Sequence, residues 1–215
     1  MRLRKIPGAE EAVQESPYVV SAPEYYIGTW NVLFKQDAPL YLEIGCGKGR
    51  FINEMAALHP DRNYLGIERI PSVLIRALEK QEAAPARNLF FLCGDAAELM
   101  NDFADWEVQG IYLNFSDPWP KERHKRRRLT APEFLDRYRR ILAPDGVIEF
   151  KTDNKGLYEF SKESAEEAGW KILLDVPDLH HSPYLDGNVM TEYEDRFVTL
   201  GEPVMKLVLK PEESE

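Results

Sequence analysis

From residue 40 onward, short apolar runs alternate with amphipathic segments, and this alternation constrains the fold more than any other feature. The apolar runs predict strands at 40–45, 63–68, 88–93, 110–115, 146–152, 170–176 and 203–209. Helical periodicity predicts helices at 49–58, 71–83, 96–104, 131–142, 155–168 and 192–199. This order is typical of βαβ units. We therefore expect an α/β fold with a seven-stranded, mostly parallel sheet and helices on both faces.

Composition limits the domain organisation and the environment. The 215 residues suit one domain at 39–215, preceded by an aromatic, turn-rich arm at 1–38 that we expect to pack on or near the cleft. No apolar run is long enough to cross a bilayer, so we expect no membrane partner. Two cysteines, Cys46 and Cys93, make neither a disulfide framework nor a zinc cluster, which favours the cytoplasm and predicts no metal site.

Acidic residues lie at or near the carboxyl ends of five of the predicted strands. These are Glu43, Glu68, Asp95, Asp117 and Asp153. Ligands of open parallel sheets bind beyond the carboxyl ends of the strands. Any one of these acids alone is more simply a solvated loop residue. As a set, they predict a rim of carboxylates around a binding cleft.

The loop after the first strand reads E-x-G-x-G-x-G, with Gly45, Gly47 and Gly49. A tight turn before a helix explains these glycines about as well as a ligand does. Glu68 is spaced to accept both hydroxyls of a ribose, and Asp95 is placed to accept from an adenine amino group. An acidic rim suits a cofactor with a positive centre, such as the sulfonium of S-adenosylmethionine. The charge pattern therefore favours a methyltransferase over a nicotinamide oxidoreductase.

One segment departs from the acidic average. The chain carries 27 − 37 = −10 overall, which argues against a surface that binds nucleic acid everywhere. Residues 121–128 hold six basic side chains and one acid, or 6 − 1 = +5, so the rest of the chain carries −10 − 5 = −15. A solvated basic face is the ordinary explanation. The position directly after a strand-end acid instead predicts a basic mouth that binds phosphates.

Five segments carry a family resemblance. The run N-F-S-D-P-W-P-K at 114–121 is followed by R-H-K-R-R-R at 123–128. F-K-T-D-N at 150–154, N-V-M-T-E-Y-E at 188–194 and G-T-W-N at 28–31 extend the likeness. Over nearly its whole length the chain resembles the bacterial single-subunit tRNA (guanine-N7-)-methyltransferases.

This resemblance implies a Rossmann-like class I methyltransferase fold without an obligate protein subunit. It also implies S-adenosyl-L-methionine as methyl donor and the guanosine at position 46, in the variable loop of tRNA, as acceptor. The acids Glu43, Glu68, Asp95 and Asp117 match positions that contact the cofactor or the reaction centre. The positions that match substrate contacts are Lys121, Asp153, Thr191, Glu192, Tyr193 and Glu194. The stretch that matches RNA contacts is Arg123, His124, Lys125, Arg126, Arg127 and Arg128.

The implied reaction needs no general base, because guanine N7 carries a free lone pair at neutral pH. It needs in-line positioning and a carboxylate near the positive charge that develops on the base. We assign that electrostatic and orienting role to Asp117. Pro118 and Pro120 stiffen its loop, and Trp119 either stacks on a base or fills a gap beneath the loop.

Several alternatives remain open at this stage. The chain could be a class I methyltransferase that acts on another RNA site, a small molecule or a protein, or an RNA-binding module without a cofactor.

Thr191 and Glu194 also form the sequence pattern of a capping box, with Glu194 reaching back to Thr191. His180 and His181 lack the spacing of a metal site. Basic residues at positions 2, 4 and 5 could add to the field of the mouth. The sequence allows a monomer or a homodimer.

Overall fold

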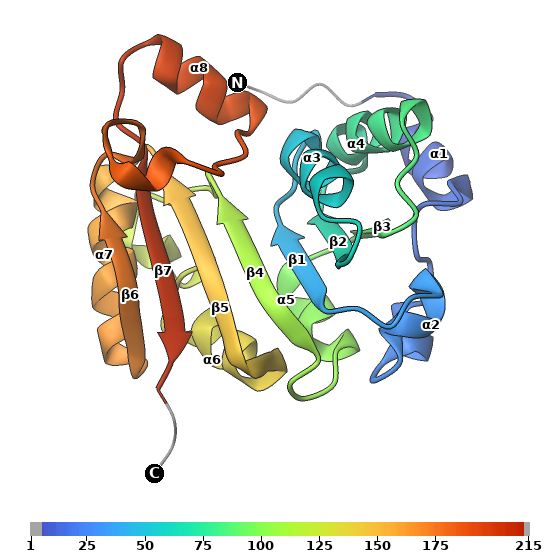
Figure 1. Ribbon diagram of the computed structural model, residues 1–215, viewed down its shortest axis with the longest axis horizontal. Coiled ribbons are helices and arrows are strands. Elements are labelled where there is room, and N and C mark those ends of the chain that lie inside the picture. The colour runs from blue at the N-terminus through green and yellow to red at the C-terminus, as the bar shows by residue number, and fades with distance from the viewer. Residues whose placement is uncertain (1–5, 213–215) are drawn as a thin grey trace.

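The computed structural model describes residues 6–212, so the predicted contribution of Arg2, Arg4 and Lys5 lies outside the described residues. Seven strands form one sheet in the order β3-β2-β1-β4-β5-β7-β6 (Figure 1). β1 to β5 pair in parallel, and β7 runs antiparallel to both of its neighbours. The strands are β1 Leu40–Ile44, β2 Asn63–Glu68, β3 Leu89–Cys93, β4 Val108–Asn114, β5 Leu142–Thr152, β6 Trp170–Val176 and β7 Met205–Pro211. The predicted fold class is confirmed.

Helices connect the strands where periodicity predicted them. They are α3 Arg50–Leu58, α4 Pro71–Ala83, α5 Ala96–Leu99, α6 Pro132–Ile141, α7 Lys155–Glu167 and α8 Glu192–Thr199. α5 is shorter than predicted, because its end tightens into the 3₁₀ helix η2, Met100–Asp102. α6 begins at a proline, which is tolerated in a first helical turn because its missing N–H would have no helical partner there.

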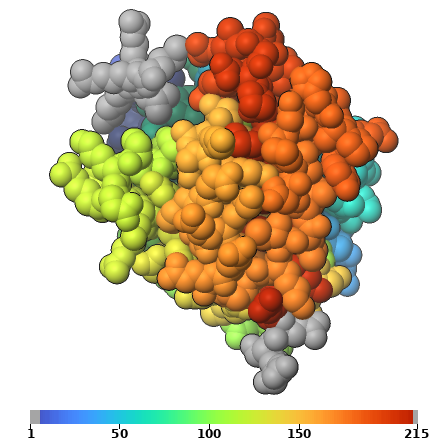
Figure 2. All heavy atoms as spheres, turned by 90° about the vertical axis from the view of Figure 1, so that its left-hand side faces the viewer, coloured from blue at the N-terminus to red at the C-terminus, as the bar shows by residue number. Residues whose placement is uncertain are grey.

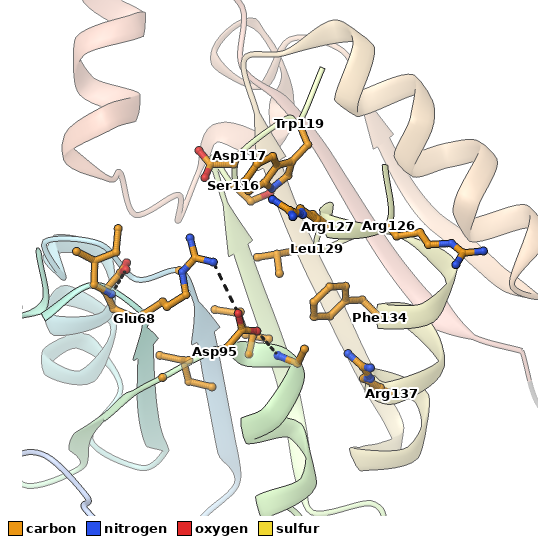
Figure 3. Close-up of a pocket in the computed structure, with 18 of the residues that line it drawn as sticks. Glu68, Asp95, Ser116, Asp117, Trp119, Arg126, Arg127, Leu129, Phe134 and Arg137 are labelled. Atoms are coloured by element: carbon orange, nitrogen blue, oxygen red, sulfur yellow. Dashed lines mark hydrogen bonds and ion pairs between the residues drawn. The ribbon is translucent and has the colours of Figure 1, made fainter. Parts of the chain in front are cut away.

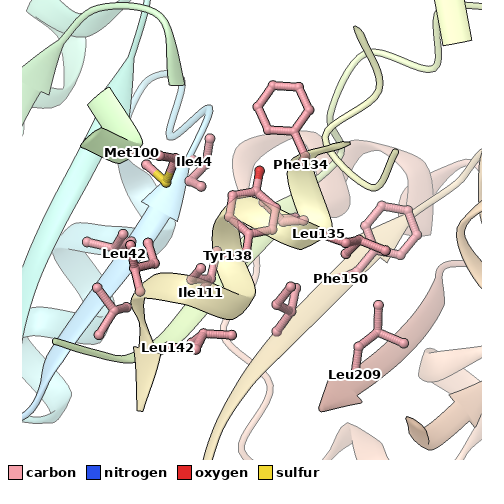
Figure 4. Close-up of a cluster of buried hydrophobic side chains, with 14 of the residues drawn as sticks. Leu42, Ile44, Met100, Ile111, Phe134, Leu135, Tyr138, Leu142, Phe150 and Leu209 are labelled. Carbon is pink, nitrogen blue, oxygen red and sulfur yellow. The ribbon is translucent and has the colours of Figure 1, made fainter. Parts of the chain in front are cut away.

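Two apolar layers flank the sheet. Leu40, Leu42 and Ile44 of β1 point into the larger cluster, which α6 and α7 cover (Figure 4). Tyr41 points the other way, against the cluster covered by α3 and α4. Successive strand side chains alternate between faces, so Glu43 belongs to the face of Tyr41.

The arm contains two helices and a 3₁₀ turn that sequence periodicity missed. These are α1 Ala9–Glu15, η1 Pro23–Tyr26 and α2 Trp30–Phe34. Trp30 is buried and stacks on Tyr26 and on Phe103. The backbone N–H of Val20 donates to the carbonyl of Phe91, which ties the arm to the β3 edge of the sheet. The described part of the arm is therefore packed on the domain. Within residues 6–212, no helix is long and apolar enough to span a membrane.

Candidate active site

A cleft of about 880 Å³ opens at the carboxyl ends of the central strands (Figure 3). The ends of β1, β2, β3 and β4 supply one part of its lining, and α6 with the segment before it supplies the other. Glu68, Asp95 and Asp117 are the three strand-end acids that line it. The sequence prediction of a shared carboxylate rim is correct for these three.

Glu68 is fixed by the loops that it joins. Its side-chain oxygens accept hydrogen bonds from the N–H groups of Gly47 at 3.1 Å and Ile70 at 2.9 Å. Burial raises the pKa of this carboxyl, and these hydrogen bonds oppose the rise. Gly45, with a φ of +78°, lines the cleft, and no atom within 4 Å would meet a Cβ there. Gly49 is buried at the start of α3. Gly45 and Glu68 thus lie on one wall of the cleft with room for a close ligand, whereas the predicted cofactor contacts Gly47 and Gly49 are not among its lining residues.

Asp95 begins α5. Its Oδ1 accepts from the N–H of Ala97 at 2.9 Å, as an N-cap residue does. Its Oδ2 lies 3.7 Å from Arg69 (Figure 3), and the side chains of Arg69 and Asp95 are 59% and 45% exposed. Capping fixes the side chain at the cleft and leaves one carboxylate oxygen free of hydrogen bonds from the backbone.

Asp117 lies on a strained loop. Phe115 and Trp119, which flank it, have φ values of +51° and +41°, a region that non-glycine residues rarely adopt. The guanidinium of Arg128 holds the loop, because it donates to the carbonyls of Pro118 at 3.0 Å and Trp119 at 3.1 Å. Strain of this kind persists where surrounding contacts maintain it, and it clusters at functional sites. Asp117 itself is exposed into the cleft.

Glu43 and Asp153 do not line the cleft, so the prediction of five acids on one rim is wrong for these two. Glu43 faces the α3 side, where it is 2% exposed, and its Oε1 accepts from Nδ2 of Asn114 at 2.9 Å. Burial raises its pKa to about 8, although Lys151 lies close enough to oppose the rise. Asp153 is half-buried beyond the end of β5, and burial raises its pKa. Side-chain alternation along β1 explains the position of Glu43.

The basic segment borders the cleft, as predicted. It forms the 3₁₀ helix η3, Glu122–Arg127, which begins after the exposed Lys121. Arg126 and Arg127 line the cleft, and Figure 2 shows this region, in yellow-green, projecting from the body of the protein. Arg127 lies 5.0 Å above the ring of Trp119, and His124 meets the same ring edge-on. Trp119 also lines the cleft.

The remaining basic side chains of this segment differ in their surroundings. Lys125 pairs with Glu122 at 2.8 Å, and both are exposed. Arg123 is exposed, and its Nε lies 3.3 Å from His124. Arg128 is half-buried and is committed to holding the loop that carries Asp117. Five of the six cations are therefore exposed, whereas Arg128 is structural.

Residues 191–194 divide between surface and interior. Thr191 caps α8, because its hydroxyl accepts from the N–H of Glu194 at 2.9 Å. The reciprocal half of the predicted capping box is absent: the Glu194 carboxylate is fully buried and bonded to Lys151 instead. Glu192 pairs with Lys80 at 3.0 Å. Tyr193 is 46% exposed.

Sequence reasoning missed four polar residues of the lining: Arg69, Ser116, Glu133 and Arg137. Ser116 Oγ is buried, and no hydrogen-bond partner for it exists among the described residues. Its position beside Asp117 in the specific motif was the available signal. Arg137 projects from α6 on the side opposite Glu68 (Figure 3), and nothing local in the sequence distinguishes it from a surface arginine.

The architecture and cleft define a class I methyltransferase fold. The 16S rRNA methyltransferase KamB superposes with a TM-score of 0.62 at 18% identity, covering 84% of this chain and 91% of that one. A SAM-dependent methyltransferase from Aquifex aeolicus superposes with a TM-score of 0.57 at 13% identity, covering 95% and 98%. At these identities the likeness shows the fold alone.

Sequence comparison gives the family. Residues 37–207 match a family described as putative methyltransferase. A tRNA (guanine-N(7)-)-methyltransferase of Lachnoclostridium phytofermentans is 50% identical over 208 residues, 97% of each chain. One from Bacillus subtilis is 45% identical over 207 residues, covering 96% of this chain and 97% of that one. The chain belongs to the tRNA (guanine-N7-)-methyltransferase family.

Proposed function

We propose that this protein transfers the methyl group of S-adenosylmethionine to N7 of a guanosine in the variable loop of tRNA. The observation that carries the proposal is the joining of an acidic cofactor wall and a basic mouth in one cleft. Glu68 and Asp95 lie on the first, and Arg126 and Arg127 lie on the second. A small-molecule methyltransferase would have no use for the basic mouth.

The cleft suits the cofactor by the chemistry of its donors. Glu68 can accept ribose hydroxyls with lone pairs that the loop N–H groups leave free. The open backbone at Gly45 allows close approach of a ligand. When bound, S-adenosylmethionine supplies an electrophilic methyl group on a sulfonium. Carboxylates around the cleft stabilise that positive centre by charge.

Asp117 is the catalytic residue in this proposal. Guanine N7 attacks without losing a proton, so Asp117 acts as a fixed negative charge near the base. Arg128 holds its loop, with the strained backbone at Phe115 and Trp119, in one conformation. Such a preorganised charge needs little rearrangement as the reaction proceeds. Asp117 therefore orients the base and stabilises the positive charge that appears on it.

The substrate side combines exposed cations with Tyr193. Lys121 and the exposed cations of residues 123–127 would neutralise phosphates near the cleft. Tyr193 lies near both Asp153 and Asp117, whose negative charges help burial to raise the pKa of its hydroxyl. These three residues flank the place where the base would enter. The remaining acidic surface would repel RNA and favour one approach.

The test is methylation of two tRNA transcripts that differ only at the variable-loop guanosine. With labelled S-adenosylmethionine, the unchanged transcript should yield labelled N7-methylguanosine, and cleavage at that base should map it to the variable loop. The transcript with adenosine at this position should take up no label. Label in another nucleoside, or equal label in both transcripts, would refute the proposed site.

We place this activity in the cytoplasm and in a chain that needs no second kind of subunit. Both cysteines are unpaired thiols in the structure, and Cys46 is buried. Light scattering after size exclusion distinguishes a monomer from a homodimer, and activity of the purified single chain tests the absence of an obligate partner.

A further inference from the structure

Glu194 is the centre of a buried polar cluster. Its Oε2 accepts from Lys151 Nζ at 2.6 Å, and its Oε1 accepts from Asn188 Nδ2 at 2.7 Å and His180 Nε2 at 3.0 Å. The side chain is 0% exposed. Both carboxylate oxygens are therefore used inside the protein, although this residue matches a substrate position of the family.

Lys151 is equally committed. Beyond Glu194, its ammonium donates to Oδ1 of Asn188 at 3.0 Å and to the carbonyl of Val189 at 2.9 Å. An ammonium has three N–H donors, so all of them have partners. Burial lowers the pKa of Lys151, and the charge of Glu194 opposes this. The cluster joins the end of β5, the 3₁₀ helix η4 (Leu179–His181), the loop at 188–189 and α8.

The buried cluster stabilises the position of α8 more than the other polar contacts of this helix do. Glu192 with Lys80 and Asp195 with Arg50 form ion pairs at 3.0 Å and 3.3 Å, but these side chains are about a third or more exposed. Exposed pairs contribute little to stability, because water screens their charges. A charge left unpaired in the interior costs far more. The orientation of α8 is therefore set chiefly at Glu194.

The residue before Glu194 reaches the reaction centre. Tyr193 stacks on Phe197 at 4.5 Å and packs on Phe115 at 5.2 Å between ring centroids. Phe115 lines the cleft and lies two residues before Asp117. A rotation or shift of α8 would move the Tyr193 ring away from this contact and change the substrate-side wall.

We propose that Lys151, His180 and Asn188 are positioning residues for the methyl acceptor, acting through Glu194 to hold α8 and Tyr193 beside the catalytic loop. Glu68 itself lies at the end of β2 and is held by Gly47 and Ile70, not by the buried cluster, so the effect falls chiefly on the tRNA side. This inference rests on the proposed function for the identity of its substrate. The position of α8 can be measured whether or not tRNA is the substrate.

Two adjacent histidines of η4 provide a matched test. His180 contacts Glu194, whereas His181 is 85% exposed and pairs only with Asp178 among the contacts described. His180→Ala should raise KM for tRNA about tenfold, which corresponds to about 1.4 kcal/mol. Its affinity for S-adenosylhomocysteine should stay within about twofold of the wild-type value. His181→Ala should match the wild type in both. His180→Gln can donate to the same carboxylate and should recover most of the loss.

Hydrogen exchange separates this inference from the proposed function. In His180→Ala, amides of residues 189–199 should exchange faster, while those of β2, residues 63–68, should not change. The exchange result can be obtained even if the wild-type protein does not methylate tRNA. Failure of the wild type to methylate tRNA would refute only the proposed function. Unchanged KM for tRNA and unchanged exchange in α8 would overturn the positioning role. So would an equal loss of affinity for S-adenosylhomocysteine.

Discussion

The buried carboxyl of Glu43 predicts an unusual dependence of stability on pH. Folding moves it from water to a site where Asn114 is its hydrogen-bond partner, and its pKa rises from 4.5 to about 8. Below pH 4.5 it is protonated in both states and contributes nothing. Between pH 4.5 and pH 8 only the unfolded state ionises, so the free energy of unfolding falls by about 1.4 kcal/mol per pH unit. Above pH 8 the loss levels off at about 5 kcal/mol.

Glu43→Gln removes this penalty, because a neutral amide of similar shape replaces a group that is mostly neutral when folded. Urea unfolding of both proteins should show that the variant gains on the wild type as pH rises. The gain between pH 5 and pH 8 should be about 3 to 4 kcal/mol. Glu98→Gln, which removes an exposed carboxyl, should show no such trend. A difference between Glu43→Gln and the wild type that is constant across pH would refute the reasoning.

Two further predictions concern RNA binding and the glycine loop. The double variant Arg126→Glu, Arg127→Glu should weaken tRNA binding and reduce the slope of log affinity against log salt concentration by about 1 to 2. Its affinity for the cofactor, measured by calorimetry, should not change. An unchanged salt slope would reject the basic mouth. Gly49→Ala should cost about 3 kcal/mol in urea unfolding, because its Cβ would lie 2.4 Å from that of Ala77 at a φ of +74°. Gly187→Ala, with a φ of +76° and open space, should cost only about 1 kcal/mol, and equal costs would refute the steric argument.

Local patterns predicted most of the fold and part of the site. Glu68, Asp95 and Asp117 could be placed together because each follows an apolar strand and parallel strands end at one edge. Glu43 obeys the same rule along the chain but points to the opposite face. The alternation of Tyr41 with Leu42 contained that information, but only the packing of α3 shows that this face is closed.

Contacts between distant segments could not be predicted from one sequence. Trp30 packs on Phe103, and its indole donates to the carbonyl of Asp102 at 3.2 Å, so the helices of the arm depend on tertiary packing. Lys151 and Glu194 are 43 residues apart, and no periodicity relates them. A motif that matches a family's substrate position identified Glu194 as important, but its burial changes what it can do.

The central claim is that Asp117 stabilises charge and orients the base without accepting a proton. The most direct test is the single-turnover rate of Asp117→Asn on tRNA at saturating S-adenosylmethionine, measured from pH 6 to pH 9. The account predicts a loss of about a hundredfold or more that is similar at every pH, with tRNA still bound. A wild-type rate in Asp117→Asn would contradict the account.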